Sequence, residues 1–342
     1  MSHGPLVSAV SLLVLVLTVT AFGGDRLDLA SREFVFEAAP VPSCHASTVV
    51  ELNDGLLTAW FGGSQEGAND VSIWASRKVR AEAWSKPVEV ADGVDHDGHR
   101  YPCWNPVLFE LKDEVLLFYK VGPSPSRWWG VLKRSRDDGQ TWSKDELLPD
   151  GIYGPIKNKP VLLTDGLLVS GSSTEHRGWW VHFERTTDDG QTWSRSGPTR
   201  GEMPVSAIQP ALLVHGPLKL QMLCRTREKR IYDSWSEDGG VTWSALKPTE
   251  LPNPNSGLDA VTLKDGRHVV IYNHTEQGRS PLNLAISRDG KTWTPGPVLE
   301  SEPGEYSYPA IIQTTDGRLH ATWTWKRQKI AHAVLKLGEG SQ

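Results

Sequence analysis

The chain has 342 residues and a net charge of -5, and charged residues make up 23% of it. This length suits one large domain or two ordinary ones, and the balanced charge excludes a nucleic-acid-binding polycation and a highly charged disordered chain. The 15 tryptophans are unusual for this length and indicate a repeated packing role, a sugar-binding surface, or both.

The N-terminal part contains an apolar run over residues 6–22, followed by Gly23 and Gly24. Because the run is short for a membrane span, we expect a signal peptide over residues 1–23 and a secreted or periplasmic protein. The residues before the run include no Lys or Arg, so an uncleaved N-terminal anchor is the alternative. No later segment is apolar enough to cross a membrane, and we expect a mature domain over residues 24–342.

A hairpin pattern recurs along this expected domain. Apolar runs meet at a tight turn and are followed by a second apolar run, which is typical of β-hairpins. The turns fall at residues 54–55, 113–114, 165–166, 215–216, 265–266 and 316–317. This regular spacing, with room for about four strands in each unit, predicts propeller blades.

A second pattern alternates with the first. Four copies of an Asp-Gly motif that ends in Trp occupy Ser135–Trp142, Thr186–Trp193, Ser236–Trp243 and Ser287–Trp293, and a worn copy spans Ser76–Trp84. The Asp and Ser side chains of such a motif bond backbone N–H groups of a tight loop, Gly takes the positive φ, and Trp packs against a neighbouring sheet. We therefore interpret these Asp residues as structural and not catalytic.

Together the two patterns predict an all-β fold, a six-bladed β-propeller. After Trp325 only one strand-like run remains, residues 329–337, and a further strand-like run lies at residues 32–39. We expect the N-terminal run to complete the last blade, because this closure removes open sheet edges.

The first strand of each blade lines the channel of a propeller, so the residues that begin these strands should meet at one mouth. Counting back from each turn gives Cys44, His45, Ala46, Cys103, Trp104, Asn105, Lys157, Asn158, Lys159, Gln209, Asp259, Tyr306 and Tyr308. We interpret this polar ring as a candidate binding site, because pockets with convergent polar groups commonly bind ligands. A ring that only hydrates the channel is the alternative.

The third strands begin near the same face. Asp70 precedes one of them, and tryptophan pairs that include Trp128 and Trp179 precede two others. These rings favour either sugar stacking or packing between blades.

Cationic side chains also gather at the inferred mouth: Lys157, Lys159, Arg225, Arg279 and Arg100. Because the whole chain is acidic, this local excess indicates an anionic ligand, and Arg pairs with a carboxylate in bidentate geometry. Ion pairs with nearby Asp and Glu are the alternative interpretation.

These features resemble the sialidase superfamily, most closely its bacterial branch of predicted neuraminidases with BNR (Asp-box) repeats. The resemblance covers nearly all of the mature chain. It implies an arginine triad for a substrate carboxylate, with Arg225 and Arg279 similar to its second and third members. It also implies a nucleophile at Tyr306, which precedes Ser307, and an acid/base at Asp70, with Glu66 as its rival.

Two positions depart from the pattern of the family. His45 stands near the expected first arginine, whose work Lys157 and Lys159 are the other candidates to do. Gln209 stands where a Glu should assist the tyrosine, and an amide cannot accept the phenol proton. Glu175, Glu202 and Glu305 are the candidate substitutes.

We therefore predict a secreted exo-glycosidase of sialidase type that hydrolyses terminal sialic acid or a related acidic sugar from glycans. Tyr306, Asp70, His45, Gln209 and Glu66 are the catalytic candidates. The predicted substrate contacts are Arg225, Arg279, Lys157, Lys159, Asn105, Asp259, Tyr308, Trp128 and Trp179. One alternative is a polysaccharide lyase or rhamnosidase-like enzyme that uses His45 and a tyrosine, and another is a non-catalytic glycan-binding propeller.

The three cysteines fit an exported protein that does not depend on a disulfide framework. Cys44 and Cys103 occupy equivalent positions in adjacent blades, which leaves both a disulfide and two buried thiols open. No residue spacing demands a metal or a cofactor, and we expect a monomer with no nucleic-acid partner and no membrane contact after signal cleavage.

Overall fold

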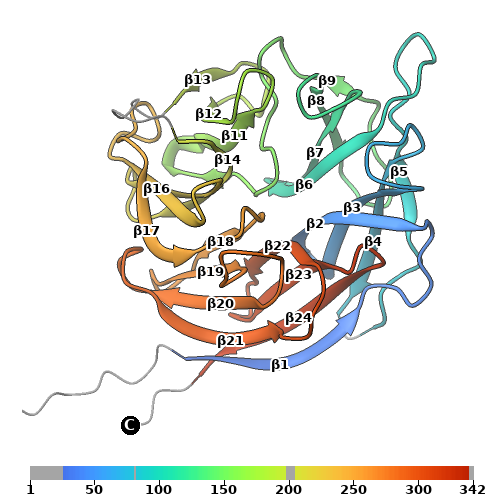
Figure 1. The fold of residues 1–342 in the computed structure, drawn as a ribbon. Coiled ribbons are helices and arrows are strands. Elements are labelled where there is room, and N and C mark those ends of the chain that lie inside the picture. Colours follow the sequence, from blue (N-terminus) through green and yellow to red (C-terminus); the bar gives the residue numbers. More distant parts are fainter. Residues whose placement is uncertain (1–25, 81, 198–204, 339–342) are drawn as a thin grey trace, which may run out of the picture.

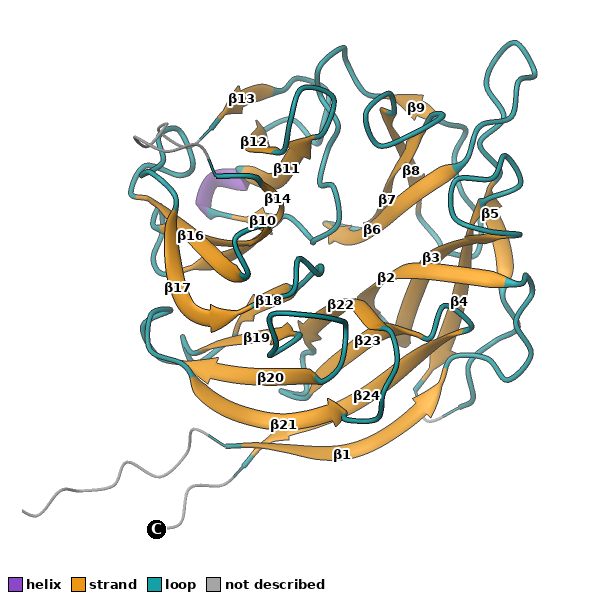
Figure 2. Cartoon of the chain, viewed as in Figure 1, coloured by secondary structure: helices purple, strands orange, loops and turns teal. Residues whose placement is uncertain are grey.

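The computed structural model describes residues 26–80, 82–197 and 205–338, so the expected signal peptide over residues 1–23 lies outside them. The described chain forms six four-stranded antiparallel sheets around a common centre, as Figure 1 shows. One short 3₁₀-helix, η1 (Thr164–Gly166), accompanies the strands (Figure 2). The expectation of an all-β, six-bladed propeller is confirmed. No helix in these residues is long and apolar enough to cross a membrane.

The first three blades follow one another along the chain, and in each the first strand is innermost. Blade one contains β2 (Ser43–Leu52), β3 (Gly55–Gly63), β4 (Ser72–Val79) and β5 (Val88–Ala91). Blade two contains β6 (Cys103–Leu111), β7 (Glu114–Val121), β8 (Trp129–Ser135) and β9 (Glu146–Leu147). Blade three contains β10 (Val161–Leu162), β11 (Leu168–Thr174), β12 (Trp180–Thr186) and β13 (Ser194–Ser196).

The remaining blades complete the ring. Blade four contains β14 (Ala207–Val214), β15 (Leu220–Thr226), β16 (Arg230–Ser236) and β17 (Lys247–Pro252). Blade five contains β18 (Asp259–Thr262), β19 (His268–Tyr272), β20 (Leu282–Ser287) and β21 (Thr294–Glu300). Blade six contains β22 (Tyr306–Gln313), β23 (Leu319–Trp325), β24 (Lys329–Leu337) and, as its outermost strand, β1 (Leu27–Phe34).

The N-terminal strand closes the ring as expected, but it lies earlier in the sequence than residues 32–39. Its register runs from Leu27 opposite Leu337 to Phe34 opposite Ala331. The difference has a packing cause, because Val35 and the residue after it turn away from the strand and are buried against Trp60 of blade one. Part of the apolar run that resembled a strand therefore fills the space between blades one and six.

Polar contacts hold this closing strand to both of its neighbours. Glu33 of β1 accepts hydrogen bonds from Trp84 (3.1 Å) and Lys78 (3.1 Å), and its carboxylate lies 2.9 Å from His332. The bond to His332 is the largest cause that lowers the pKa of Glu33 to about 2. An ionised carboxylate thus joins blade six to blade one at the seam of the ring.

The core lies between the faces of neighbouring blades. Leu57, Leu117 and Tyr119 belong to one buried cluster between blades one and two, and Trp323 and Leu284 belong to another between blades five and six. The middle strands are buried runs rich in β-branched and aromatic residues, which suits strands covered on both faces. Burial of each such large apolar side chain contributes about 1.5–3 kcal/mol.

The Asp-Gly motifs fold as the loops that their residue types indicate. In the first full copy, Ser135 Oγ accepts a hydrogen bond from the N–H of Gly139 at 2.8 Å. Asp137 accepts one from the N–H of Thr141 at 2.8 Å and one from its hydroxyl at 2.6 Å. These bonds from Thr141 lower the pKa of Asp137 to about 2. The terminal ring of another copy, Trp243, stacks on Phe183 of blade three at 3.6 Å between ring centroids.

Candidate active site

The mouth of the channel is shaped by β-bulges at the same point of four innermost strands. In each bulge a residue other than glycine takes a left-handed backbone: Ala46 (φ 58°), Asn105 (φ 39°), Gln209 (φ 58°) and Tyr308 (φ 49°). A bulge adds one residue and redirects the side chains on either side of it. Strained positions of this kind cluster at functional sites, so their alignment around one ring identifies the mouth as the candidate site.

Tyr308 lies at the centre of a hydrogen-bond network at this mouth. Its phenolic oxygen accepts a hydrogen bond from Arg225 Nη1 at 2.7 Å and one from Gln209 Nε2 at 3.2 Å. Arg225 Nη1 also donates to Gln209 Oε1 at 3.3 Å, which fixes the orientation of the amide. The hydroxyl proton of Tyr308 has no acceptor among the residues that the structure describes. The oxygen therefore accepts two hydrogen bonds from the protein, and its own O–H group remains available to donate to a ligand.

Three more groups surround the Tyr308 ring. His45 of β2 lies against it with 4.2 Å between ring centroids, and Arg279 places its guanidinium 5.7 Å from the ring centroid. Gly257 forms the opposite wall, where an added Cβ would lie 3.2 Å from the ring. The ring is thus held in one position by residues from blades one and five.

Tyr306 occupies a different environment from the one expected for a nucleophile. Its side chain is 1% exposed and packs in the core cluster with Trp323 and Ile311. Residues two apart normally share one face of a strand, but the register shift between Ser307 and Ala310 separates Tyr306 from Tyr308. The structure therefore brings the phenol of Tyr308, and not that of Tyr306, to the arginines.

His45 is buried at the mouth as a neutral imidazole. Its Nδ1 lies 3.0 Å from Thr324 Oγ1, and that hydroxyl oxygen also accepts the N–H of Ala46 at 3.0 Å. Burial lowers the pKa of His45 well below its ordinary value, and the surrounding cations Arg327, Arg279, Arg225 and Lys157 lower it further. Its Nε2 has no partner in the described part of the chain. The lowered pKa keeps the ring uncharged among these cations.

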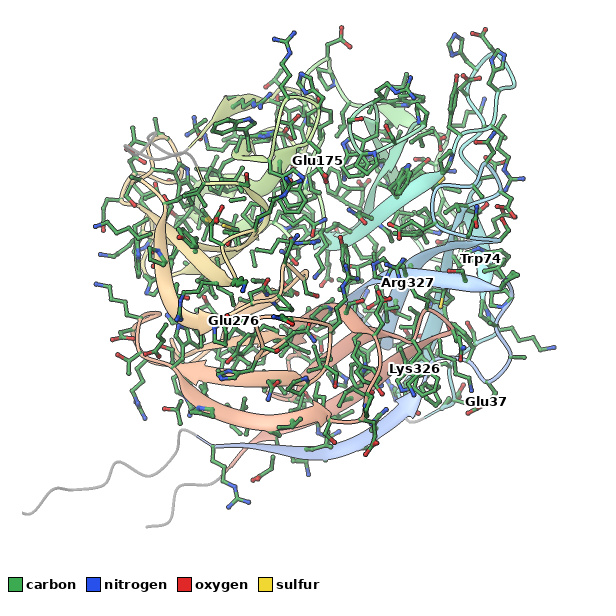
Figure 3. All side chains as sticks on the ribbon, viewed as in Figure 1. Glu37, Trp74, Glu175, Glu276, Lys326 and Arg327 are labelled. Carbon is green, nitrogen blue, oxygen red and sulfur yellow. The ribbon has the colours of Figure 1, made fainter. Side chains whose placement is uncertain are left out.

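Two arginines share one carboxylate beside His45. Glu305 Oε1 accepts hydrogen bonds from Arg279 Nη1 and from Arg327 Nε, both at 2.7 Å. Although burial opposes ionisation, Arg327 and Arg279 lower the pKa of Glu305. Arg327 also donates to Glu66 at 2.5 Å. Figure 3 shows Arg327 and Glu175 on different sides of the middle of the ring.

Arg327 was not among the residues predicted from the sequence. It occurs once, in the short turn between β23 and β24, and the repeat pattern marks no equivalent in the other blades. The sequence held one signal for it. Arg327 comes two residues after Trp325, the last residue of β23, and Trp325 pairs with Tyr306 at the start of β22.

The two lysines that were expected to bind substrate are committed to protein groups. Lys157 Nζ donates to Asn158 Oδ1 and to the carbonyl of Leu258, each at 2.9 Å, and to the carbonyl of Pro309. Burial lowers the pKa of Lys157 to about 7. These three acceptors engage every N–H of the ammonium group, so Lys157 has none left for a ligand.

Lys159 forms an ion pair with Asp259 at 2.9 Å and donates to the carbonyl of Ala260 at 2.9 Å. Asp259 is buried and also accepts the N–H of Ile311 at 2.8 Å. The interpretation as a structural ion pair therefore applies to Lys159 and Asp259, which tie blade three to blades five and six.

The acidic candidates of blade one lie on the loop between β3 and β4. Both carboxylate oxygens of Asp70 accept hydrogen bonds from Ser64, at 3.0 Å from its N–H and 2.9 Å from its hydroxyl. Asp70 is exposed, whereas Glu66 is paired with Arg327. Asp70 is thus the more available of the two for proton exchange with a ligand.

The tryptophans and Asn105 differ in their access to solvent. Trp128 is buried against Trp104, with 6.1 Å between ring centroids, so its role is packing between strands. Trp179 is half-buried, and the guanidinium of Arg227 lies 4.3 Å from its ring centroid. Asn105 is 5% exposed at the bulge of blade two.

Among the candidate substitutes for the missing glutamate, Glu175 follows β11 and lies near Arg225. Burial raises its pKa, which Arg225 and a hydrogen bond from Trp179 partly oppose. Glu305 is engaged by the two arginines, and Glu202 lies outside the described residues. Glu175 is therefore the carboxyl group of this set whose environment favours the protonated form.

The three cysteines are free and buried, so the structure contains no disulfide between Cys44 and Cys103. The two thiols belong to different clusters, Cys44 with Trp60 and Cys103 with Leu117. Burial raises the pKa of Cys44 to about 12. Within residues 26–80, 82–197 and 205–338, no group of three or more His, Cys, Asp and Glu could hold a metal ion.

Comparison with known proteins adds family evidence to this geometry. Residues 54–321 match the family described as the BNR repeat-like domain. A sialidase of Bacteroides fragilis (strain YCH46) is 26% identical over 206 residues, which is 53% of this chain. The match spans only 36% of the length of that relative.

Solved structures share the fold at low sequence identity. A Dyadobacter fermentans protein of unknown function has a TM-score of 0.76 at 17% identity, covering 91% of this chain and 99% of its own. The NanB sialidase of Streptococcus pneumoniae has a TM-score of 0.72 at 12% identity, covering 89% of this chain and 70% of its own. The intramolecular trans-sialidase of Ruminococcus gnavus, in complex with oseltamivir carboxylate, has a TM-score of 0.72 at 12% identity, with coverages of 89% and 96%.

Proposed function

Because the chain belongs to the BNR repeat-like family of the sialidase superfamily, we propose that it is a glycoside hydrolase that releases terminal sialic acid or a related acidic sugar from glycans. The observation that carries this proposal is the Tyr308 hydroxyl, which is bonded by Arg225 and Gln209 under the Arg279 guanidinium. Arginines around a nucleophile suit a sugar whose reacting carbon carries a carboxylate.

In the proposed reaction, the oxygen of Tyr308 attacks the anomeric carbon. A neutral phenol avoids the repulsion that a carboxylate nucleophile would meet at a centre already bearing a carboxylate, and sialidases are an exception to the two-carboxylate rule. The hydrogen bonds from Arg225 and Gln209 stabilise negative charge on the phenol oxygen as its proton leaves. His45 is the proposed acceptor of that proton, because its ring lies against that of Tyr308 with 4.2 Å between ring centroids.

The leaving group needs a proton from an acid at the rim. We assign this role to Asp70, because it is exposed and its partner is the neutral Ser64. Glu66 is instead engaged in an ion pair with Arg327.

Two tyrosine variants test the assignment with a matched control. Tyr308→Phe removes only the phenol oxygen and is expected to lower kcat for 4-methylumbelliferyl α-N-acetylneuraminide on the order of 10³-fold or more. Tyr306→Phe, two residues away in the same strand, is expected to keep most of the activity. Full activity in Tyr308→Phe, or loss in Tyr306→Phe alone, contradicts the assignment of the nucleophile.

A second candidate function has an observation of its own. Gln209 presents its amide N–H to Tyr308 instead of a carboxylate, and His45 is neutral beside the same ring. On a polysaccharide that contains uronate, including one with rhamnose, arginines would neutralise the carboxylate while His45 removes the neighbouring proton and Tyr308 protonates the leaving oxygen. Appearance of an unsaturated uronide from ulvan or pectic fragments, with no cleavage of sialosides, favours this lyase reaction.

Binding without turnover is the remaining outcome. A glycan array that shows retention of acidic glycans, combined with no product from sialosides or uronates, identifies a non-catalytic glycan-binding propeller. Retention and product together support the hydrolase.

We also propose that residues 1–23 direct export and are removed, so that the enzyme acts outside the cytoplasm as a monomer. The apolar run over residues 6–22 supports the export signal. N-terminal sequencing of the exported protein should begin near Gly24, and light scattering during size-exclusion chromatography should give the monomer mass. Retention of the N-terminus, or a dimer mass, contradicts the respective part of this proposal.

A further inference from the structure

We propose that Asn158 and Ser173 of blade three are positioning residues for the reaction at Tyr308, because together they hold Gln209 in the backbone conformation that brings its amide to the phenol. The inference rests on the proposed function, in which the hydrogen bond from Gln209 stabilises the tyrosine oxygen. The hydrogen bonds of Asn158 and Ser173 go to the backbone of Gln209, so both residues act through it.

Gln209 has a backbone conformation that needs support. Its φ of 58° is left-handed, a region that residues with a Cβ rarely adopt. It occupies the bulge of β14, where the register shifts between Ile208 and Ala211. Strained backbone of this kind persists only where the surrounding structure enforces it. At Gln209 the contacts that enforce it come from the neighbouring blade.

Blade three bonds both backbone polar groups of Gln209. The N–H of Gln209 donates to Ser173 Oγ at 3.2 Å, and its carbonyl accepts a hydrogen bond from Asn158 Nδ2 at 3.0 Å. All three residues are at most 2% exposed, so solvent water is not at hand to replace these bonds. An unpaired buried backbone group is costly, and the two bonds therefore favour the bulged conformation.

The irregular start of blade three makes the contact from Asn158 possible. The innermost strand, β10, covers only Val161–Leu162, and residues 152–160 ahead of it are not in a strand. Figure 1 shows β14 beside β11 of blade three. Gly171 of β11 lies so close to Pro210 that an added Cβ would stand 2.5 Å from the Pro210 carbonyl oxygen. The bulge of β14 is therefore packed tightly against blade three.

The amide of Asn158 has one orientation that satisfies its partners. Its Oδ1 accepts a hydrogen bond from Lys157 Nζ at 2.9 Å, and an ammonium group only donates. The Nδ2 group therefore faces the carbonyl of Gln209, which only accepts. Lys157 also donates to the carbonyl of Pro309, the residue after Tyr308. This buried pair of side chains thus contacts the backbone at Gln209 and next to Tyr308, the two residues whose side chains meet.

The side chain of Gln209 depends on this support. Its Nε2 donates to the Tyr308 oxygen at 3.2 Å, and its Oε1 accepts from Arg225 at 3.3 Å. Both distances are at the long end of the hydrogen-bond range, so a small change of the backbone breaks the bonds. Arg225 keeps its own bond to the Tyr308 oxygen when the amide leaves. The expected defect is one lost donor to the nucleophile, with substrate binding intact.

The test variants each remove one support of Gln209. Asn158→Asp keeps the shape of the side chain and an acceptor for Lys157, but it has no N–H for the carbonyl of Gln209. Ser173→Ala removes the acceptor of the Gln209 N–H. Each variant is also combined with Gln209→Ala, which removes the amide itself.

The controls make the same chemical changes where no contact with Gln209 exists. Gln221→Glu converts a buried amide that donates to the carbonyl of Gly290, and Gln221 pairs with Leu213 near the other end of β14. Ser172→Ala removes a buried hydroxyl that has no hydrogen-bond partner among the described residues. Both controls should keep the kcat of the wild type.

The first readout is hydrolysis of 4-methylumbelliferyl α-N-acetylneuraminide. Gln209→Ala should lower kcat about 10-fold, which is the usual cost of one hydrogen bond, and leave KM within about 2-fold. Asn158→Asp and Ser173→Ala should each lower kcat about 3- to 10-fold, with the same unchanged KM. In the Gln209→Ala background neither should lower kcat by more than about 2-fold further, because effects that pass through one group do not add.

The second readout needs no turnover. It follows the ring resonances of Tyr308 by NMR in protein with isotope-labelled tyrosine, and the loss of these resonances in Tyr308→Phe identifies them. Gln209→Ala should move the resonances, and Asn158→Asp and Ser173→Ala should move them in the same direction. Gln221→Glu and Ser172→Ala should leave them in place.

Three outcomes overturn the inference: wild-type Tyr308 resonances in either test variant, equal movement in its control, or a loss of kcat that adds in full to that of Gln209→Ala. Circular dichroism identifies a variant that does not fold, and the other test variant then decides. Failure of the proposed function is seen separately, as a wild type that hydrolyses no sialoside. The movement of the Tyr308 resonances then still supports or overturns the positioning of Gln209.

Discussion

The cations at the mouth look alike in the sequence, but in the structure they form two groups with different partners. Lys157 and Lys159 of blade three reach across the axis, and their ammonium groups donate to carbonyls, an amide oxygen and Asp259. Arg279 and Arg327 lie at the opposite side and share Glu305. The ammonium groups of the lysines are bonded to the protein's own acceptors, while the arginines keep N–H groups without a protein partner in the described residues.

This difference teaches that a local excess of positive charge does not by itself identify a ligand site. An ammonium is a compact charge that three backbone acceptors can satisfy completely. A guanidinium carries five N–H groups in a fixed plane, so one carboxylate leaves several of them free. The lysines should therefore act on stability and the arginines on ligand recognition.

The largest expected effect is on folding, through Lys157. Lys157→Met leaves two buried carbonyls and the Asn158 side chain without their donor, which should lower the free energy of unfolding by about 3 kcal/mol. Urea denaturation measures this loss. Lys219→Met, at an exposed ion pair with Glu237, is the control and should change stability by less than about 0.5 kcal/mol. Equal stability of the two variants would remove the distinction between the groups.

The next effect is on recognition, through Arg279. Arg279→Gln should lower kcat/KM for a sialoside about 10- to 100-fold, because a charged hydrogen bond to the carboxylate is lost. Its stability should stay close to that of the wild type, since Arg327 still pairs with Glu305. Denaturation and steady-state kinetics on the same preparation separate the two effects. If the variant is strongly destabilised but has a normal kcat/KM, Arg279 contributes to stability, as the lysines do, and not to recognition.

The smallest expected effect is a change in the pKa of His45. The folded pKa lies well below the ordinary value near 6.5, so the unfolded state binds more protons in acid. The stability that His45 contributes is present above about pH 6.5 and is lost as the pH falls toward the folded pKa. Arg327→Gln should raise the pKa of His45, because a nearby cation is removed.

Lys219→Met is the matched variant for this measurement, because Lys219 is exposed and is not among the groups that shift the pKa of His45. The ring resonances of His45, followed by NMR across a pH titration, report both values. If the pKa of His45 shifts equally in the two variants, the net charge of the protein controls this pKa, and the proximity of Arg327 does not.

The fold was predictable because its information is repeated. Each Asp-Gly motif encodes a loop by local hydrogen bonds, as Ser135 and Asp137 show, and the copies reinforce one another. The sequence correctly predicted that an N-terminal strand closes blade six, but it placed this strand at residues 32–39 and not at Leu27–Phe34. Val35 and its neighbour are as apolar as a strand residue, and only the three-dimensional contact with Trp60 shows that they leave the sheet.

The site was less predictable, because its details occur only once. Alternation along a strand treats Tyr306 and Tyr308 as equivalent, and the bulge that separates them depends on long-range strand register. Arg327 lies in a turn that no repeat marks. The partners of Lys157 and Asp259 come from other blades across the channel axis. The local sequence around each residue carries no signal for such contacts.

The seam of blade six has a consequence for how the chain reaches its native state. β1 precedes all the other described strands and β24 follows them, yet Leu27 pairs with Leu337, so the edge of β1 stays unpaired until β24 has been synthesised. Contacts between such distant residues form late and slow the final step of folding.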